Sequence, residues 1–197
     1  MNEKKTILNY NQALEKSEKY CAYQERCQSE VRNKLYEWGL YSKEVESIIA
    51  ELVTNRFINE ERFAKAYTSG KFRIKQWGRI KIKNELKKRK LSEYCINTAI
   101  EEIPEQEYLD SLKKLIFKKA KLIKKTNNYI YKNKLAAYAV SKGFERDLVW
   151  KVIENILKQK LNFYLIIIFP VPRISLDSVA IVYKYEPDWS ALISIVC

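Results

Sequence analysis

A run of basic side chains between residues 71 and 90 is the part of this sequence best suited to a chemical task. The segment KFRIKQWGRIKIKNELKKRK holds ten Lys and Arg residues but a single carboxylate, Glu85. Closely spaced cations with one counter-charge repel one another, so an external anion would stabilise them. The run therefore favours contact with phosphate or with an acidic protein surface. The alternative is a solvated basic face whose aliphatic stems cover apolar surface.

Nine side chains of this run form the first predicted binding set. On a helix through the run, Ile82 and Leu86 share one apolar face, so Lys81 and Lys88 point outward. Trp77 is the tryptophan that we expect as a surface contact, whereas core packing is the default for the other tryptophans of the helical part. The predicted partner- and DNA-binding residues are Arg73, Lys75, Trp77, Arg79, Lys81, Lys83, Lys87, Lys88 and Arg89.

A second basic cluster lies between residues 113 and 134, where nine lysines occur. No acidic residue stands between Asp110 and Glu145. Lysine is a hydrated point charge and a poor bidentate reader of bases, so the cluster favours diffuse or backbone contact over sequence readout. A solvated face is again the alternative. Four lysines of this cluster form a second, lower-ranked set of predicted binding residues: Lys118, Lys121, Lys124 and Lys125.

The composition removes most catalytic chemistry. The 197 residues include no His, which excludes Ser–His and Cys–His nucleophile pairs, His-ligated zinc and the usual general base near neutral pH. The four Gly stand far apart, so no segment has the clustered glycines of a phosphate-binding loop. We therefore expect a binding protein rather than an enzyme, with no cofactor, metal or small-molecule substrate.

The charge is concentrated in one part of the chain. The formal net charge is +13, and residues 71–160 alone carry a net +14. The four cysteines match no zinc spacing and are too few for a disulfide scaffold, which favours buried free thiols in a reducing compartment. Residues 1–8 are polar and basic without the apolar segment of a secretion signal. We expect a cytoplasmic protein without membrane contact.

Helix signals fill the first 160 residues. Pro104 is the only proline there, and apolar residues recur at helical spacing in about nine stretches. Gly39 is placed to end one helix, Ser42 to cap the next, and Ser92 to cap a later one. The sequence thus predicts an all-α fold.

The helical pattern also repeats. Turn and apolar positions align at offsets of 51 and 53 residues. The aligned turn position is occupied by Gly39, Lys90 and Gly143 in the three copies. The aligned apolar positions are occupied by Leu35, Leu86 and Ala139, by Val45, Ile96 and Val149, and by Ile49, Ile100 and Ile153. We assign three three-helix repeats to residues 9–56, 57–103 and 104–158. Because each repeat would bury a face on its neighbour, an elongated tandem array is expected. The alternative is that amphipathic helices align by chance.

The run from residue 57 to residue 100 also carries a family resemblance. It reads FINEERFAKAYTSGKFRIKQWGRIKIKNELKKRKLSEYCINTAI and resembles the core of the RecX family. Residues 29–52 resemble the first repeat of that family, and residues 141–156 resemble its third. The most specific part is the RFA sequence of Arg62–Ala64 followed by Trp77–Gly78.

The resemblance implies tandem three-helix repeats and a role as regulator of the bacterial recombinase RecA in DNA repair and recombination. It implies a protein that lies in the groove of the RecA–DNA filament, dampens ATP hydrolysis and strand exchange, and hinders filament growth. The expected partners are then the RecA nucleoprotein filament and DNA, mainly through phosphate, with the protein as a monomer. The rival hypothesis is a stand-alone helical DNA-binding or architectural protein that needs no recombinase.

Residues 161–197 have no counterpart that we recognise in that family, and we assign residues 159–197 to an appended tail. From residue 161 onward, 24 of 37 residues are apolar, and the run 165–169 is too short for a bilayer span of about 20 residues. A strand-like alternation follows at Val179, Ile181, Tyr183 and Tyr185. Three readings stay open: a segment that packs on the body, a membrane-surface or partner segment, or an extension from a changed reading frame. The abrupt change in composition favours the last.

Overall fold

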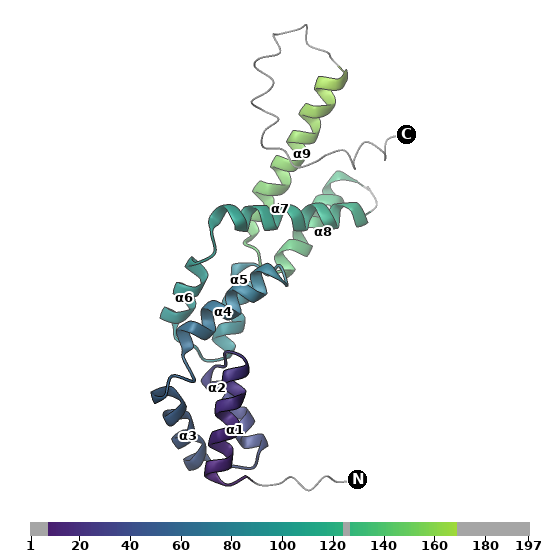
Figure 1. Ribbon diagram of the computed structural model, residues 1–197. Coiled ribbons are helices and arrows are strands. Elements are labelled where there is room, and N and C mark those ends of the chain that lie inside the picture. Colours follow the sequence, from purple (N-terminus) through teal and green to yellow (C-terminus); the bar gives the residue numbers. More distant parts are fainter. Residues whose placement is uncertain (1–7, 124–126, 169–197) are drawn as a thin grey trace, which may run out of the picture. The chain divides into compact units, whose positions relative to one another are not determined.

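The protein is helical throughout the part that the structure describes, residues 8–123 and 127–168, with side chains to residue 158. In this computed structural model (Figure 1), these residues form nine α-helices and no strand. The helices are α1 Tyr10–Tyr23, α2 Gln28–Glu37, α3 Ser42–Thr54, α4 Glu60–Arg73, α5 Arg79–Lys88, α6 Glu93–Glu101, α7 Glu105–Leu122, α8 Asn128–Ser141 and α9 Arg146–Ile168. The predicted all-α fold is confirmed.

The helices pack in threes along the chain. Helices α1, α2 and α3 contact one another, as do α4, α5 and α6, and α7 packs on α8 (Figure 1). We call these groups repeat 1 (α1–α3), repeat 2 (α4–α6) and repeat 3 (α7, α8 and the beginning of α9). The tandem three-helix repeats expected from the sequence are therefore present.

The same tight turn recurs before the third helix of each repeat. Gly39, Lys90 and Gly143 have positive φ angles of 89°, 62° and 93°. In each turn the following residue donates its backbone N–H to the carbonyl five residues earlier, at 3.3, 3.4 and 3.3 Å for Leu40 to Leu35, Leu91 to Leu86 and Phe144 to Ala139. This Schellman turn ends a helix in the left-handed region. Its recurrence at the aligned positions confirms the repeat, although Lys90 stands where the other copies have Gly.

Polar side chains begin two helices where capping is favourable. Ser92 Oγ accepts the Cys95 N–H at 3.3 Å at the start of α6, as predicted, and Asn59 caps α4 in the same way. The cap expected at Ser42 is wrong by one position, because Tyr41 occupies the cap position and Ser42 is the first helical residue. The Tyr41 N–H instead donates to the Glu44 side chain at 3.3 Å, which satisfies it from inside the first turn.

Repeat 1 has a hydrophobic core of its own. The buried members of this cluster run from Ala13 to Ile58, and Leu35, Val45 and Leu52 among them are fully buried. The cluster ends with the residues that lead into α4. Burial of such side chains stabilises the fold by roughly 1.5–3 kcal/mol each, so most of the apolar packing of repeat 1 comes from its own helices.

Charged side chains join repeat 1 to repeat 2, and we call this contact the ionic junction. Arg62 Nε lies 2.6 Å from Glu25 Oε1, and Arg89 Nε lies 3.3 Å from Glu30 Oε1. The second carboxylate oxygen of each glutamate is buried without a hydrogen-bond partner among the described residues, although Arg26 lies 3.7 Å from Glu30. A cleft of about 420 Å³ opens beside these glutamates. The contact is therefore ionic and incompletely satisfied.

Backbone groups join repeat 2 to repeat 3, and we call this contact the glycine junction. The Gly78 N–H donates to the Lys142 carbonyl at 2.9 Å, and the Ile80 N–H donates to the Gly143 carbonyl at 3.1 Å. A Cβ on Gly78 would lie 2.2 Å from the Gly143 carbonyl carbon. Only glycine fits at this approach, which explains the Gly of the Trp77–Gly78 pair that the family resemblance singled out.

Tyr108 fills the space beside the glycine junction. Its ring lies 5.9 Å from that of Phe72 and 5.0 Å from that of Phe144, and the residue is fully buried. Its hydroxyl donates to Glu145 Oε2 at 2.6 Å and accepts the backbone N–H of Arg79 at 3.1 Å. One side chain thus supplies packing and hydrogen bonds to both repeats.

The described residues up to Ile153 form one compact unit, and a second begins at Glu154. In the second unit, α9 continues to Ile168, past residue 158, where the third repeat was expected to end. The sequence permits this because no Gly or Pro occurs between Gly143 and Pro170. The predicted strand-like alternation lies outside the described residues, and so does most of the apolar tail. Among the described helices, none combines the length and the apolar character needed to cross a bilayer.

Candidate partner- and nucleic-acid-binding surface

The buried face of α5 decides where the predicted cations point. Ile82 and Leu86 are fully buried, as predicted from their spacing. Lys87 and Lys88 are exposed, and Lys81 is partly covered. The helix therefore presents several ammonium groups to solvent, and their value for binding depends on which already have a carboxylate partner.

Helix α6 neutralises one side of α5. Lys87 Nζ lies 2.5 Å from Glu93 Oε1, and Lys83 Nζ lies 3.7 Å from Glu93 Oε2 and donates to Asn97 at 3.1 Å. The hydrogen bond from Lys87 lowers the pKa of Glu93 below its ordinary value, so this carboxylate is charged at neutral pH. Exposed pairs of this kind stabilise little, but the single charge of Glu93 is shared by the two lysines and offsets part of theirs.

Two of the predicted arginines are engaged inside the protein. Arg79 donates to Glu105 at 2.7 Å and to the Ile103 carbonyl at 3.3 Å, and its guanidinium lies 4.1 Å from the Tyr108 ring centroid. Arg89 belongs to the ionic junction and also donates to the Glu85 carbonyl at 2.8 Å. Their part in binding stays a prediction, and any partner would compete with these contacts.

The remaining cations of the first set differ in their surroundings. Arg73 pairs with Glu107 at 3.2 Å, and Lys88 pairs with Glu85 at 2.8 Å within its own helix. Lys75 is exposed and forms no ion pair with any residue that the structure describes. Only part of the predicted set is therefore free of an internal carboxylate.

Trp77 lies between two lysines at the turn before α5. Lys81 Nζ is 4.6 Å from the ring centroid and Lys71 Nζ is 5.3 Å from it. The Trp77 backbone N–H donates to the Lys71 carbonyl at 3.2 Å, which holds the turn against the end of α4. The indole is partly exposed, with cations over its face rather than other aromatic rings.

The lysines of α7 form the second part of the surface. Lys118 and Lys121 are exposed and have no carboxylate partner in the described part of the chain. Lys119 Nζ lies 4.9 Å from the ring centroid of Tyr138 on α8, and Lys142 Nζ lies 5.7 Å from the same centroid. The other two predicted residues of this cluster, Lys124 and Lys125, lie outside the described residues.

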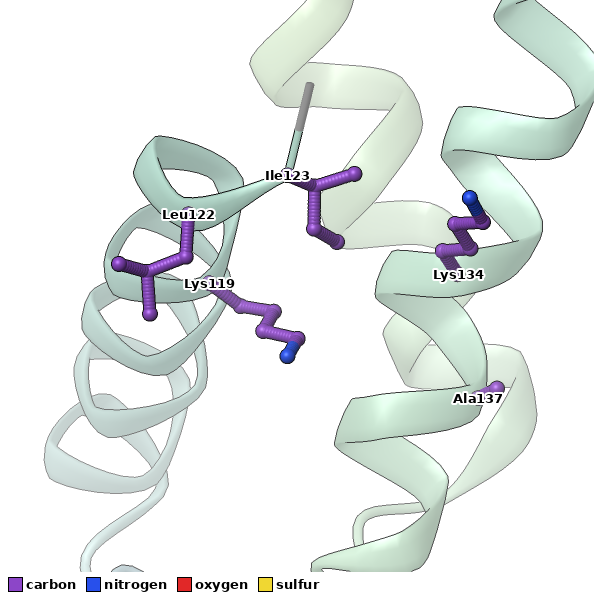
Figure 2. A pocket seen from close by; sticks show the side chains of 5 residues that line it. All are labelled: Lys119, Leu122, Ile123, Lys134 and Ala137. Carbon is purple, nitrogen blue, oxygen red and sulfur yellow. The ribbon is translucent and has the colours of Figure 1, made fainter. Parts of the chain in front are cut away.

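A shallow depression lies between α7 and α8, with a volume of about 450 Å³. It is lined by Lys119, Leu122, Ile123, Lys134 and Ala137. Figure 2 shows the Lys119 side chain reaching from α7 toward α8, with Lys134 on the opposite helix. Cations next to apolar carbon suit an anion that also carries a flat or apolar part.

Three structural features were missed by the reading of the sequence. Tyr108 was not expected in the core, although its spacing from Leu112 and Leu115 places all three on one helix face. The contact between Gly78 and Gly143 joins residues far apart in the chain, and no local pattern signals it. Lys71, Lys119 and Lys142 were likewise left out of the predicted set. The proximity of Lys119 to Tyr138 arises only in the folded chain, whereas the spacing of four residues between Tyr138 and Lys142 could have signalled theirs.

Thiol and metal chemistry receive no support from the geometry. Burial raises the pKa of the Cys21 thiol to about 11 and also raises that of Cys27, so both are protonated at neutral pH. Cys21 and Cys27 are buried free thiols, as expected. Among the described residues, no group of three or more Cys, Asp or Glu is placed to hold a metal ion.

Three family models match the chain in order. The first three-helix domain of RecX matches residues 13–52, the second matches residues 59–100 and the third matches residues 105–153. Two curated relatives, both named regulatory protein RecX, come from Bacillus cytotoxicus and Bacillus thuringiensis. They are 27% and 26% identical over 155 residues, which make up 77% of this chain and 57% of each relative. The chain thus spans little more than half the length of these relatives.

Solved structures show the same fold. The crystal structure of RecX from Lactobacillus salivarius superimposes with a TM-score of 0.66 at 21% identity, covering 74% of this chain and 95% of that chain. A second crystal structure, of a regulatory protein RecX, gives a TM-score of 0.66 at 20% identity and covers 74% of this chain and 73% of that chain. At these identities the likeness concerns the fold alone.

Proposed function

Because the chain belongs to the RecX family, we propose that it regulates a RecA-type recombinase by binding the recombinase–DNA filament. The observation that carries the proposal is the ordered match of all three RecX three-helix domains. The concentration of positive charge in residues 71–160 supports it, because a filament presents DNA phosphate. Catalysis by the protein itself is not part of the proposal.

The proposed mechanism is inhibitory. The repeats follow the groove of the filament, and lysines of repeats 2 and 3 meet DNA phosphate and acidic recombinase surface. The bound protein then hinders the subunit changes that ATP turnover requires. The predicted residues without an internal carboxylate partner among the described residues, Lys75, Lys81, Lys118 and Lys121, would make the first contacts.

The test is ATP hydrolysis by the recombinase of the same organism on single-stranded DNA, titrated with the full chain. Inhibition below one molecule per recombinase monomer, at a salt concentration where the protein binds bare DNA weakly, is the expected result. Unchanged hydrolysis and strand exchange at saturating protein would contradict the proposal.

A charge-reversal pair locates the site. Lys118→Glu with Lys121→Glu should weaken inhibition about tenfold or more, because two phosphate contacts are lost and two repulsions are added. Lys16→Glu with Lys43→Glu is the matched control, since these two lysines of repeat 1 are exposed and lack ion pairs with described residues. If both pairs of substitutions weakened inhibition equally, the loss would come from the change in net charge rather than from this surface.

A stand-alone DNA-binding protein is the second candidate function. It is favoured by the same lysines, because ammonium groups without internal partners would bind phosphate in the absence of any recombinase. Its affinity for bare duplex would fall steeply with salt, by about 0.9 in log affinity per log unit of salt for each phosphate neutralised. Tight, salt-sensitive binding to bare DNA together with no effect on the recombinase would favour this candidate.

A further inference from the structure

Two aromatic rings on the surface of repeats 2 and 3 each lie under a pair of lysines. Lys71 and Lys81 approach the Trp77 ring, and Lys119 and Lys142 approach the Tyr138 ring, at 4.6–5.7 Å from Nζ to ring centroid. Both rings are partly exposed. We call these residues the lysine–aromatic surface: Lys71, Trp77, Lys81, Lys119, Tyr138 and Lys142.

The two halves of this surface meet at the glycine junction. Gly78, next to Trp77, donates its N–H to the Lys142 carbonyl at 2.9 Å. The Lys81 Cβ lies so close to Gly143 that a Cβ there would be 2.2 Å away. Tyr138 precedes Lys142 by four residues, about 6 Å along α8. Trp77 and Tyr138 are therefore held on neighbouring parts of one rigid contact.

The lysines of this surface have no negative partner among the described residues. None of the four forms an ion pair with a carboxylate in the described part of the chain. On the same helix α5, by contrast, Lys83, Lys87 and Lys88 all have one. Four ammonium groups without a counter-charge repel one another, and their attraction to the ring faces compensates only in part.

We propose that the lysine–aromatic surface binds single-stranded nucleic acid, with bases stacked on Trp77 and Tyr138 and phosphates on the four lysines. Alternation of exposed rings with unpaired cations is what a single strand requires, because its bases are free to stack and its backbone is anionic. On binding, each ammonium moves from a ring face to a phosphate. The proposal deepens the proposed function, on which it rests, by naming the form of DNA that is held.

A duplex and an acidic peptide fit the surface less well. The bases of a duplex are already stacked on one another, so they cannot use the two rings without being unpaired. An acidic peptide would use the lysines but gives no reason for the two rings beneath them. Lysines supply charge without base-specific readout. The proposed site therefore distinguishes single-stranded from double-stranded nucleic acid, but not one base sequence from another.

The first experiment measures binding of the full chain to a labelled oligothymidine of about 20 nucleotides and to the corresponding duplex, by fluorescence anisotropy. Trp77→Ala with Tyr138→Ala should weaken single-strand binding about tenfold or more while the salt dependence stays the same. Duplex affinity should change less than about twofold. Trp77→Phe and Tyr138→Phe keep a ring and should stay within about threefold of the parent.

Lysine variants test the other half of the surface. Lys81→Gln should weaken single-strand binding. It should also reduce the slope of log affinity against log salt concentration by about 0.7, the value for one phosphate contact on a single strand. Lys16→Gln is a matched control, because Lys16 Nζ also lies 4.6 Å from an indole ring, that of Trp38 in repeat 1. This control should bind as the parent does.

The proposal is overturned if the Ala pair binds the single strand like the parent, or if it loses single strand and duplex equally while the Phe variants confirm that the fold is intact. Direct binding of labelled polyglutamate together with no binding of oligothymidine would assign the surface to an acidic peptide instead. These assays contain no recombinase. Inhibition of the recombinase that persists in the Ala pair would leave the regulatory function standing and remove only this site.

Discussion

The two junctions between repeats are built from different chemistry. The ionic junction relies on Arg62 with Glu25 and Arg89 with Glu30, and it leaves one oxygen of each glutamate without a hydrogen bond to a described residue. The glycine junction also has ion pairs at its edge, from Arg73 and Arg79 to α7, but two backbone hydrogen bonds and a fully buried tyrosine lie beside them. Among described residues, no backbone hydrogen bond crosses the ionic junction.

This difference predicts different responses to the environment. Partly exposed ion pairs are weakened by salt, whereas backbone hydrogen bonds and buried rings are not. The lysine–aromatic surface lies on the glycine junction, so its two rings are held by the contact that salt should leave intact. Repeat 1 has its own core, and its attachment to repeat 2 should be the more easily perturbed.

The largest expected effect is that of Gly78→Ala. The new Cβ would meet the backbone of Gly143 and Phe144 at 2.2–2.3 Å, and backbone atoms cannot move aside as a flexible side chain can. The free energy of unfolding should fall by about 3 kcal/mol, as measured by urea denaturation. Gly70→Ala is the matched control, because no atom lies within 4 Å of its Cβ position in α4. This control should be neutral or stabilising by up to about 1 kcal/mol, and equal losses in both variants would refute the tight approach.

Tyr108→Phe should have the next largest effect. It keeps the ring but removes the hydroxyl that bonds to Glu145 and Arg79, leaving both groups short of a partner. A loss of about 2 kcal/mol in the free energy of unfolding is expected. The loss should be similar at low and high salt, and a loss that disappears in salt would show that the contact is mainly ionic.

Alkaline pH offers a second test of Tyr108. Burial, reinforced by the hydrogen bond to Glu145, raises its pKa above the ordinary value of 10.0. Above that pH the unfolded tyrosine loses its proton while the folded one retains it, so this stabilisation is present below pH 10 and falls as the pH rises. Tyr108→Phe should therefore lose less stability than the parent between neutral pH and about pH 11. Parallel pH profiles of the two proteins would contradict the assignment.

The smallest effect is expected at the ionic junction. Glu30→Gln removes the charge facing Arg89 and should cost about 1 kcal/mol at low salt, because the pair is partly exposed. The difference from the parent should vanish near 1 M salt, where the Debye length is about 3 Å. Glu18→Gln, which affects no ion pair with a described residue, serves as the control. A loss of several kcal/mol that persists in salt would mean that the two junctions are alike.

Local patterns were sufficient to predict the helices and the repeat. Apolar spacing placed Ile82 and Leu86 in the core, and the aligned turn positions at Gly39, Lys90 and Gly143 all adopt a positive φ. These features depend on neighbours within about five residues, so the sequence carries them directly. The helix that runs past Leu157 was also compatible with the sequence, because helix breakers occur only later.

The candidate site could be predicted only in part. The abundance of cations in residues 71–90 follows from composition, but their individual roles do not. Arg79 and Lys87 belong to the same basic run, yet each is paired with a glutamate of another helix, at 2.7 and 2.5 Å. Their partners stand 26 and 6 residues away, and only the packing of α5 on its neighbours determines which carboxylate each one meets.

The sequence by itself determined the helices, the three tandem repeats and the excess of positive charge, because each depends on residue type and short-range spacing. The tertiary structure decided which lysines have no carboxylate partner among the described residues, which two rings share one surface, and which glycines touch. Trp77 and Tyr138 are 61 residues apart in the chain, and they become parts of one surface through the hydrogen bond from Gly78 to Lys142. Long-range contacts of this kind leave no local signal, because they depend on how whole helices pack.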